Sequence, residues 1–598
     1  MERLEHGGVP LFWEQGPEPA IGALLFRAGE ADEPPARRGQ SHMVEHLALH
    51  RVGRREFSTN GFVDLLQTGF YASGTAVEVS RFLHEVTLAL GEPTQERFDR
   101  ELDVLRTEAA RDTGDFVSRI LHLRYGSRGF GVAHLQELGL RWMRPPDVEE
   151  WRAERFTAGN AVAWMLSPRP PELDLRLPAG ERHPPPSAEA LPGLRFPAWI
   201  DSGTGRVAGA MVAGCSWELS AALNVAHERL YERLREARGI SYSVDGGAQP
   251  LGADTSHISI GADCLDERGA EVAREMLEIL GELAELGPTE EELDALRRRA
   301  DRPDPDERGT RLGRLADAAD DLLLGRETPS PGEAEARRAA VTAPAAGDAL
   351  AAALDSMIVI VPEGCDAPRA GLHPLEREAE PIAAPRVRAR AWRQADELLI
   401  GEAGVQWEDG EGSRITIPAD EIAFVVRTRD GDMTVHGIDG SYVTVNPARI
   451  VEPETAMAAL DELARGRLIE DDDPATPLID SVAEEQLKRR WTVADELDLL
   501  LEVLHDGEQP RLMAEATRGI RTGLLVQTDR RLLFLFKGMR NEEFLDVALG
   551  DVAGVESSSR PWGSRLRVTG RGERLEFSSI VPRERAAEIA GALRAGGR

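Results

Sequence analysis

Three residues in the segment GQSHMVEHLALH have the types and spacing of a metal-dependent hydrolytic site: His42, Glu45 and His46. On a helix, residues i and i+4 lie about 40° apart around the axis, so the two imidazoles can bind one metal ion. Glu45 lies on the same face, where its carboxylate can take a proton from a metal-bound water. Imidazole ligands with an open position for water are typical of zinc. The segment therefore predicts a zinc site with a general base.

The residues before this helix support the hypothesis. The stretch FWEQGPEPAIGALLFRAGEADEPPARRGQ reads as a strand, a glycine, an acidic patch and a glycine-led approach to the motif. With GQSHMVEH, which is close to G-x-[AS]-H-[FL]-x-E-H, this order resembles the insulinase/pitrilysin family of zinc peptidases. That family includes the mitochondrial processing peptidases. The resemblance implies an inverted HxxEH zinc site and a peptidase that needs Zn²⁺.

A third protein ligand is expected downstream, because two histidines and a water leave a catalytic zinc one donor short. The segment PTQERFDRELDVLRTEAARDTG predicts a helix that begins at Thr94 and ends at Gly114. Physics alone does not choose among Glu101, Asp103 and Glu108. The family pattern E-x-x-V-[IL]-x-x-E matches this helix, which implies Glu108 as the ligand and Glu101 as the carboxylate that fixes a ligand histidine.

His50 continues the stripe of His42 and His46 by one more turn. Its Cα lies about 6 Å further along the helix axis than that of His46, which is too far for the same metal ion. The family motif does not use this position either. We interpret His50 as a packed or rim histidine.

Composition describes a large acidic chain of 598 residues with a net charge of −33. No apolar run is long enough to cross a membrane and the N-terminus has no signal-peptide pattern, which predicts a cytoplasmic protein and disfavours membrane contact without excluding it. The cysteines, Cys215, Cys264 and Cys365, are scattered and odd in number, which argues against disulfides or a thiolate metal site. The negative charge argues against nucleic-acid binding. It leaves two interpretations open, simple solubility or an acidic chamber that attracts basic peptides.

The order of the expected elements predicts an α+β chain. Residues 1–185 and 195–368 each read as an α/β unit, and only the first contains the zinc motif. In the family, two such tandem sandwich domains form one half of a clamshell. Beyond them we expect a linker at 369–390, a divergent β-rich domain at 391–466, an acidic linker at 467–492 and a last domain at 493–598.

The second unit contributes a pair of its own, Arg235 and Tyr242 in LREARGISYSV. They lie seven residues apart across a helix-to-strand turn at Gly239. In the family, an arginine and a tyrosine at this spacing reach across the clamshell, hold the substrate and polarise its scissile carbonyl. The resemblance therefore implies a catalytic role for both. The alternative is an ion-paired arginine at a helix end and a tyrosine packed in a sheet.

The sequence departs from the family between His46 and Glu108, where the interval is shorter than usual. In relatives this interval contains a glycine-led edge strand and hairpin that pair with the extended substrate. Only Gly69 to Val79 is expected to remain of it here. The helix after the motif also differs, since it reads LALHRVGRR without the family's phenylalanine, glycine and threonine.

The two C-terminal segments alternate apolar and polar residues between turns, and each ends in a helix. Strands closed by a C-terminal helix are the outline of a pleckstrin-homology-like (PH-like) barrel, which predicts two small PH-like barrels. The last segment resembles bacterial PH-like domains at these residues: Gly507, Glu508, Thr528, Asp529 and Arg531. Such domains do not identify a ligand, and we interpret them as docking or assembly modules.

These observations favour a zinc endopeptidase that hydrolyses peptides or unfolded segments. His42, His46 and Glu108 are expected to hold zinc while Glu45 activates water. The alternatives are an inactive scaffold of the same fold and a docking protein that acts through its PH-like domains. Because family enzymes enclose their substrate between two halves, we expect a homodimer, or a heterodimer with a related subunit.

Overall fold

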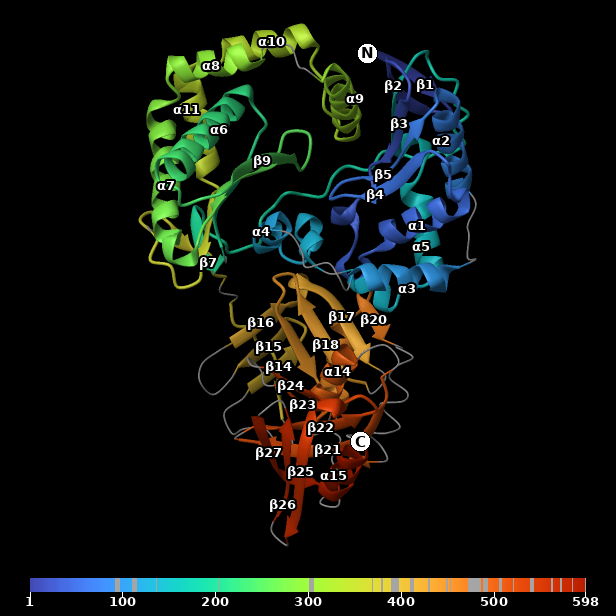
Figure 1. Cartoon of the computed structure of the whole chain (residues 1–598), viewed down its shortest axis with the longest axis vertical. Coiled ribbons are helices and arrows are strands. Elements are labelled where there is room, and N and C mark those ends of the chain that lie inside the picture. Colours follow the sequence, from blue (N-terminus) through green and yellow to red (C-terminus); the bar gives the residue numbers. More distant parts are fainter. Residues whose placement is uncertain are drawn as a thin grey trace. The chain divides into compact units, whose positions relative to one another are not determined.

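The computed structural model divides into two compact units, one formed by Met1–Glu380 with Gly437–Ser441 and one by Pro381–His436 with Tyr442–Arg598. Figure 1 shows the chain from its N-terminus in blue to its C-terminus in red. The structure describes residues 1–91, 97–109, 116–135, 137–203, 205–300, 306–367, 369–377, 380–388, 397–408, 414–428, 431–447, 450–451, 453–471, 486–487, 493–504, 508–519, 521–537, 542–560, 563–570, 573–582 and 585–596. The predicted helix ends Thr94 and Gly114 and the PH-like Gly507 lie outside these residues.

The first unit begins with a six-stranded mixed sheet in the order β1-β2-β6-β3-β5-β4. Its strands are β1 (Glu2–His6), β2 (Val9–Gln15), β3 (Ala20–Phe26), β4 (Ser58–Val63), β5 (Thr68–Gly74) and β6 (Ala161–Ser167). Alternate residues of β3 point to opposite faces, so Leu24 and Phe26 enter one core while Ala23 and Leu25 enter another. Both faces of this sheet are therefore buried.

Helices from the same part of the chain cover one face of the first sheet. They are α1 (Gln40–Val52), α2 (Ala76–Gly91), α3 (Phe98–Ala109) and α5 (Pro145–Arg155). Helix α1 packs against α2, α3, α5 and the edge strand β4. This arrangement places the motif helix between the sheet and the helix predicted to carry the third ligand.

A second six-stranded sheet follows in the order β12-β7-β11-β8-β10-β9. Its strands are β7 (Ala198–Gly203), β8 (Arg206–Ala213), β9 (Val244–Pro250), β10 (Ser256–Asp263), β11 (Ile358–Pro362) and β12 (His373–Pro374). Helices α6 (Trp217–Leu230), α7 (Gly269–Leu286) and α11 (Ala343–Leu354) pack on one face of it. The shorter α8 (Glu290–Ala300) and α10 (Pro331–Ala340) lie beside α6, as Figure 1 shows.

Each sheet has its other face covered by a helix from the opposite half of the unit. Helix α9 (Glu307–Leu323) packs Leu315 and Leu323 against β2, β3 and β6 of the first sheet. Helix α4 (Phe116–Tyr125) packs Ile120 against Ile358 and Ile360 of the second sheet. The two halves thus exchange one helix each and share their cores.

The prediction that only Gly69 to Val79 remains of the edge strand and hairpin is wrong. β4 forms the outer edge of the first sheet and pairs along its length with β5, from Ser58 opposite Ser73 to Val63 opposite Thr68. Val79, expected in the remnant, lies inside helix α2. The hairpin turn is tight, with the Asp64 amide donating to the Gln67 carbonyl at 2.8 Å, so a short interval still accommodates a full hairpin.

The second unit begins with two four-stranded sheets around one core. The first joins β13 (Arg386–Val387), β14 (Glu397–Gly401), β15 (Gly404–Glu408) and β16 (Arg414–Pro418), and the second joins β17 (Ile422–Thr428), β18 (Met433–Gly437), β19 (Tyr442–Val445) and β20 (Leu468–Asp471). Helix α12 (Pro453–Leu463) packs its Ala456 and Leu460 into the shared core. A closed barrel is not formed by the described strands of this segment.

A seven-stranded antiparallel sheet completes the second unit. It contains β21 (Pro510–Arg518), β22 (Arg521–Thr528), β23 (Arg531–Lys537), β24 (Glu542–Ala548), β25 (Val552–Arg560), β26 (Gly563–Gly570) and β27 (Glu573–Val581) in the order β24-β23-β22-β21-β27-β26-β25. Helix α15 (Arg585–Gly596) fills one side, and α14 (Ala494–Val503) covers the opposite face of β22 and β23. Over the described residues, β24 and β25 do not pair with each other, so the likeness to PH domains stays a prediction.

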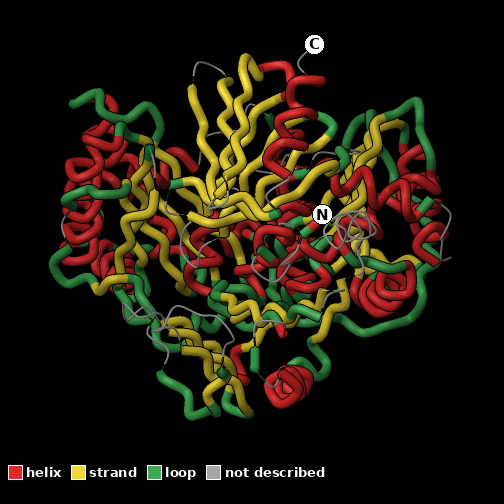
Figure 2. Tube along the Cα trace, turned by 90° about the horizontal axis from the view of Figure 1, so that it is seen from below, coloured by secondary structure: helices red, strands yellow, loops and turns green. Residues whose placement is uncertain are grey.

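Figure 2 shows helices lying against strands throughout, and the prediction of an α+β chain is confirmed. The finer domain boundaries stay predictions.

Hydrogen bonds join three of the residues that carry the resemblance to PH-like domains. The Arg531 guanidinium donates to both Glu508 oxygens, and the Thr528 hydroxyl donates to one of them. None of the described helices is both long and apolar enough for a membrane span.

Candidate metal centre

The motif helix α1 begins at a fixed point because a buried carboxylate accepts its first amides. Glu33 takes hydrogen bonds from the backbone N–H groups of Gly39, at 2.7 Å, and Ser41, at 2.6 Å. Burial raises the pKa of Glu33, and Arg38 partly offsets this through an ion pair at 3.3 Å. A carboxylate here also faces the positive end of the helix dipole. These contacts set where the first turn of α1, with His42, lies.

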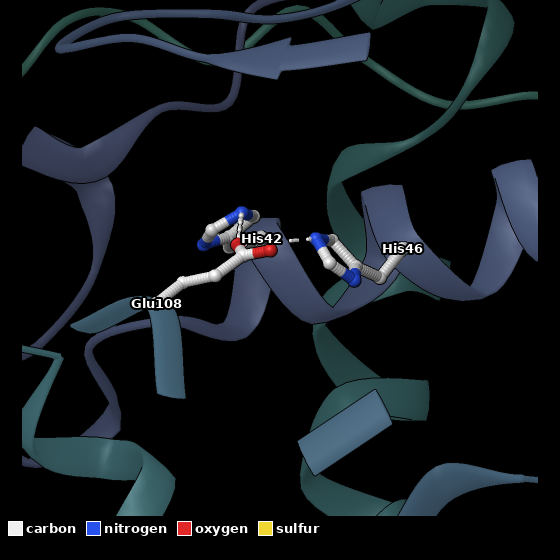
Figure 3. Close-up of side chains that lie close together, drawn as sticks. All are labelled: His42, His46 and Glu108. Atoms are coloured by element: carbon white, nitrogen blue, oxygen red, sulfur yellow. Dashed lines mark ion pairs between the residues drawn. The ribbon is translucent and has the colours of Figure 1, made fainter. Parts of the chain in front are cut away.

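The structure brings the three predicted ligands together (Figure 3). Nε2 of His42 and Nε2 of His46 each lie 3.7 Å from the same Glu108 oxygen, Oε2. All three donor atoms lie within 4.8 Å of one another, and the two imidazole rings stand nearly perpendicular at 84°. Ligands of a tetrahedral zinc at 2.0–2.1 Å are about 3.3 Å apart, so small side-chain rotations suffice. The donor set therefore fits a zinc ion with one position left for water.

Glu45 lies beside this group and is nearly buried, with 5% of its surface exposed. Its Oε2 is 3.7 Å from Nε2 of His46. Burial raises the pKa of Glu45, and the two histidines act in the opposite direction. The edge strand β4 passes directly beside it at Gly61. A base in this position can exchange protons with a water bound among the ligands.

Two carboxylates contact the predicted ligand histidines at Nδ1, the ring nitrogen that does not face Glu108. Glu101 Oε2 lies 3.3 Å from Nδ1 of His46, in the role that the resemblance implied. Glu137 Oε1 lies 3.0 Å from Nδ1 of His42. Burial opposes protonation of His42, but its bond to Glu137 and the neighbouring carboxylates raise its pKa above the ordinary value. Sequence reasoning missed Glu137, because it lies in an irregular turn 95 residues away with no motif of its own.

The alternatives left open by the sequence are separated by geometry. Asp103 points away from the ligands, with 77% of its side chain exposed, and pairs with Arg106 at 3.8 Å. His50 lies outside the ligand group and contacts the Arg97 guanidinium through both ring nitrogens, at 3.2 and 2.9 Å. This agrees with its interpretation as a rim histidine.

Comparison with known proteins finds similarity over part of the chain. Residues 205–300 match the sequence model described as the Peptidase M16 inactive domain. An uncharacterized zinc protease of Mycobacterium tuberculosis is 39% identical over 92 residues, which cover 14% of this chain and 21% of that protein. Residues 205–300 are thus similar to a domain of peptidase M16 proteins. The chain spans about a fifth of the length of the curated relatives that it matches.

Solved structures of M16 proteins are similar to part of this chain. The peptidase M16 inactive domain from Pseudomonas fluorescens aligns with a TM-score of 0.47 and 15% identity, over 61% of this chain and 98% of that one. The ferredoxin protease FusC, solved as a mutant with Arabidopsis ferredoxin, aligns with a TM-score of 0.47 and 13% identity, over 70% of this chain and 56% of that one.

The M16 match at 205–300 does not include the metal ligands. The words "inactive domain" therefore refer to a segment that does not contain His42, His46 and Glu108. They do not describe residues 1–185, where the donor set lies.

The pair predicted in the second half, Arg235 and Tyr242, lies close together in the structure. Arg235 sits in a π-helical stretch, Tyr231–Ala237, and its Nη1 donates to the Tyr242 carbonyl at 2.9 Å. Its guanidinium carbon also lies 5.2 Å from the Tyr231 ring and 5.1 Å from the Tyr242 ring. Tyr242 is 77% exposed. Among the described contacts, neither residue touches the metal ligands, and the catalytic role of the pair stays a prediction.

Proposed function

We propose that this chain is a zinc-dependent endopeptidase acting on peptides or unfolded protein segments. The observation that carries the proposal is the convergence of His42, His46 and Glu108 beside the buried Glu45. Two imidazoles, one carboxylate and an open position make up the protein part of a catalytic zinc site. The zinc protease relative of Mycobacterium tuberculosis supports the same chemistry.

The chain's own residues suggest how the reaction proceeds. His42, His46 and Glu108 would hold the zinc ion, which would supply an electrophile and lower the pKa of a bound water. Glu45 accepts the proton of the attacking water and returns it to the leaving amine, because it is buried beside the ligands. The free edge of β4 offers backbone N–H and C=O groups to an extended peptide next to Glu45. An extended substrate is the form that such an edge can pair with.

The test is cleavage of a quenched mixed-peptide library by wild type, Glu45→Gln and Glu108→Gln, each with a chelator and with added zinc. We expect wild-type activity that chelation removes and zinc restores. Glu45→Gln should retain zinc but lose about 10²- to 10⁴-fold in rate, the usual contribution of a general base. Asp103→Asn is the matched control, since it neutralises an exposed carboxylate on the same helix as Glu108. A wild type that binds zinc and cleaves nothing would favour a scaffold or docking role.

The same chain contains the metal group and the Arg235 and Tyr242 pair, so we infer a homodimer in which one copy's pair completes the site of the other. Mixing tests this arrangement. Glu45→Gln and Arg235→Ala chains, each inactive alone, should regain activity when co-assembled, because one site of a mixed dimer then has both intact parts. Absence of any recovery in a mixture shown to form dimers would refute it.

A further inference from the structure

Glu137 has an environment built around its carboxylate. It begins a 3-10 turn, Leu138–Arg141, and reaches back 95 residues in sequence to Nδ1 of His42 at 3.0 Å. Its side chain is only 15% exposed. It lies on the side of the imidazole opposite to Nε2, the atom that faces Glu108.

The turn that carries Glu137 is fastened on one side to the start of the motif helix. Gly139 lies so close to the preceding chain that a β-carbon on it would be 2.5 Å from the Arg38 carbonyl oxygen. The Trp142 indole N–H donates to the Ala36 carbonyl at 2.6 Å. Both contacts join the turn to the residues just before α1, so Glu137 and His42 are placed by the same local structure.

The other side of the turn is held by helix α3, which also carries Glu101 and Glu108. Arg106 donates from Nε to the Leu140 carbonyl at 3.0 Å and from Nη2 to the Arg141 carbonyl at 3.2 Å. The arginine thus fixes the turn relative to the helix of the third ligand. A carboxylate on such a support can orient a ring to within a small angle.

Both ligand histidines are consequently held in the same way. Glu101 faces Nδ1 of His46 and Glu137 faces Nδ1 of His42, while the two Nε2 atoms face Glu108. An imidazole that donates its Nδ1–H to a carboxylate keeps the lone pair on Nε2 and becomes a stronger metal ligand. If each Nδ1 carries the hydrogen, both rings present Nε2 in the protonation form that a metal requires.

We propose that Glu137 is a positioning residue for His42. Glu137 holds the His42 imidazole as the Nδ1–H tautomer and thereby directs Nε2 toward the metal position. The inference deepens the proposed function and rests on its zinc site. It assigns to an irregular turn a direct part in metal affinity. It also makes the metal site depend on a carboxylate outside the HxxEH motif and outside helix α3.

The experiment measures zinc affinity of the metal-free full-length protein by competition with a chromogenic chelator. The variants are Glu137→Ala and Glu137→Gln, with Glu56→Gln as a control that makes the same charge change at an exposed site. We expect a 10- to 100-fold loss of affinity for Glu137→Ala, the usual effect of removing such a partner. Glu137→Gln should lose less, because its amide oxygen still accepts from Nδ1–H. Glu56→Gln should match wild type.

A second readout separates positioning from a merely structural role. Nitrogen-15 spectra of the His42 ring, assigned by its loss in His42→Asn, should show the Nδ1–H tautomer in wild type and a mixture in Glu137→Ala. A wild-type spectrum and wild-type affinity in Glu137→Ala would overturn the inference while leaving the zinc site intact. An equal loss of zinc affinity in Glu56→Gln would show that the loss comes from the change in net charge, and would also overturn the inference. A wild type that binds no zinc would refute the proposed function itself.

Discussion

Gly61 lies directly against Glu45: a β-carbon built at position 61 would be 2.1 Å from Oε1 of the glutamate and 2.8 Å from its carboxyl carbon. The edge strand β4 and the predicted general base therefore occupy adjoining space, and a side chain at residue 61 would force the Glu45 carboxylate to move. The strand available for pairing with a substrate, β4, is thus in contact with Glu45, the residue proposed to transfer the proton of the attacking water.

Gly61→Ala should displace the Glu45 carboxylate and lower activity by about 100-fold, because a shift of about 1 Å in a catalytic group has effects of this size. Zinc affinity should change little, since the three atoms nearest to a β-carbon at residue 61 belong to Glu45 and not to a predicted ligand. The measurements are kcat/KM on a peptide substrate and zinc content. Gly313→Ala, where no atom lies within 4 Å of the new carbon, is the control and should keep full activity. Unchanged turnover in Gly61→Ala would contradict the prediction.

The buried Glu33 should be essential for the start of α1. Glu33→Ala removes the acceptor for the Gly39 and Ser41 amides and leaves Arg38 with one carboxylate fewer in a buried site. Breaking a buried ion pair of this kind costs about 3–5 kcal/mol. Because a chain of several domains has no single unfolding free energy, the readout is hydrogen exchange of the α1 amides.

Glu30→Ala is the matched control for Glu33→Ala, since Glu30 also pairs with Arg38, at 2.8 Å, but has 26% of its side chain exposed. Its effect on α1 exchange should be clearly smaller. Equal exchange rates in the two variants would show that the helix does not depend on Glu33.

Stability should fall as pH rises from about 4 to about 6 through Asp320 on α9. Burial raises its pKa from 3.8 to about 6, and the neighbouring Asp317 adds to the shift, while Gln67 and Arg326 oppose it. Between these values the folded chain holds the proton more tightly than the unfolded chain, so loss of the proton at higher pH destabilises the fold. The full shift corresponds to about 3 kcal/mol.

Asp320→Asn removes this titration, and its Tm should change less between pH 4 and 6 than that of wild type. At pH 7 the variant should be the more stable of the two, because it no longer buries a charge. Tm measured against pH by calorimetry checks both statements. Parallel curves of Tm against pH for wild type and Asp320→Asn would rule out Asp320 as the source of the pH dependence.

Zinc should stabilise the first unit without the help of His50. At a zinc concentration of about 100 times Kd, binding to the folded state adds about 2.7 kcal/mol. Wild type and His50→Ala should show the same rise in Tm, since His50 contacts Arg97 and lies outside the donor group. Glu108→Ala should show little or none. A zinc response lost in His50→Ala would assign that ring a ligand role.

Sequence reasoning found the metal group because its chemistry is local. His42, Glu45 and His46 lie within two turns of one helix, and the family pattern singled out Glu108 over Asp103, which the structure leaves pointing into solvent. Glu137 could not be found in this way. It reaches His42 only because Arg106 and Gly139 fold an irregular turn onto α1, and such long-range packing has no periodic signal.

The edge strand was missed for a different reason. Its residues, STNGFV, have few apolar side chains and two residues that usually mark turns, so they do not alternate like a strand. Strand β4 is specified by its neighbours instead, through pairing with β5 and contact with α1. In the second unit, the alternation predicted the strands correctly, but closure into barrels depends on pairing between distant ends, which alternation does not report.

Because α4 and α9 each cover the sheet of the other half, a truncated fragment of this chain would expose apolar surface. A fragment ending near residue 185 keeps all metal ligands, yet it loses α9 and bares Phe12, Leu25 and Leu166 on the first sheet. A fragment beginning near residue 195 loses α4 in the same way and bares Ile358 and Ile360. Each half would expose an apolar sheet face and is expected to aggregate when expressed alone. We therefore expect the shortest fragment that folds into this arrangement to include both halves.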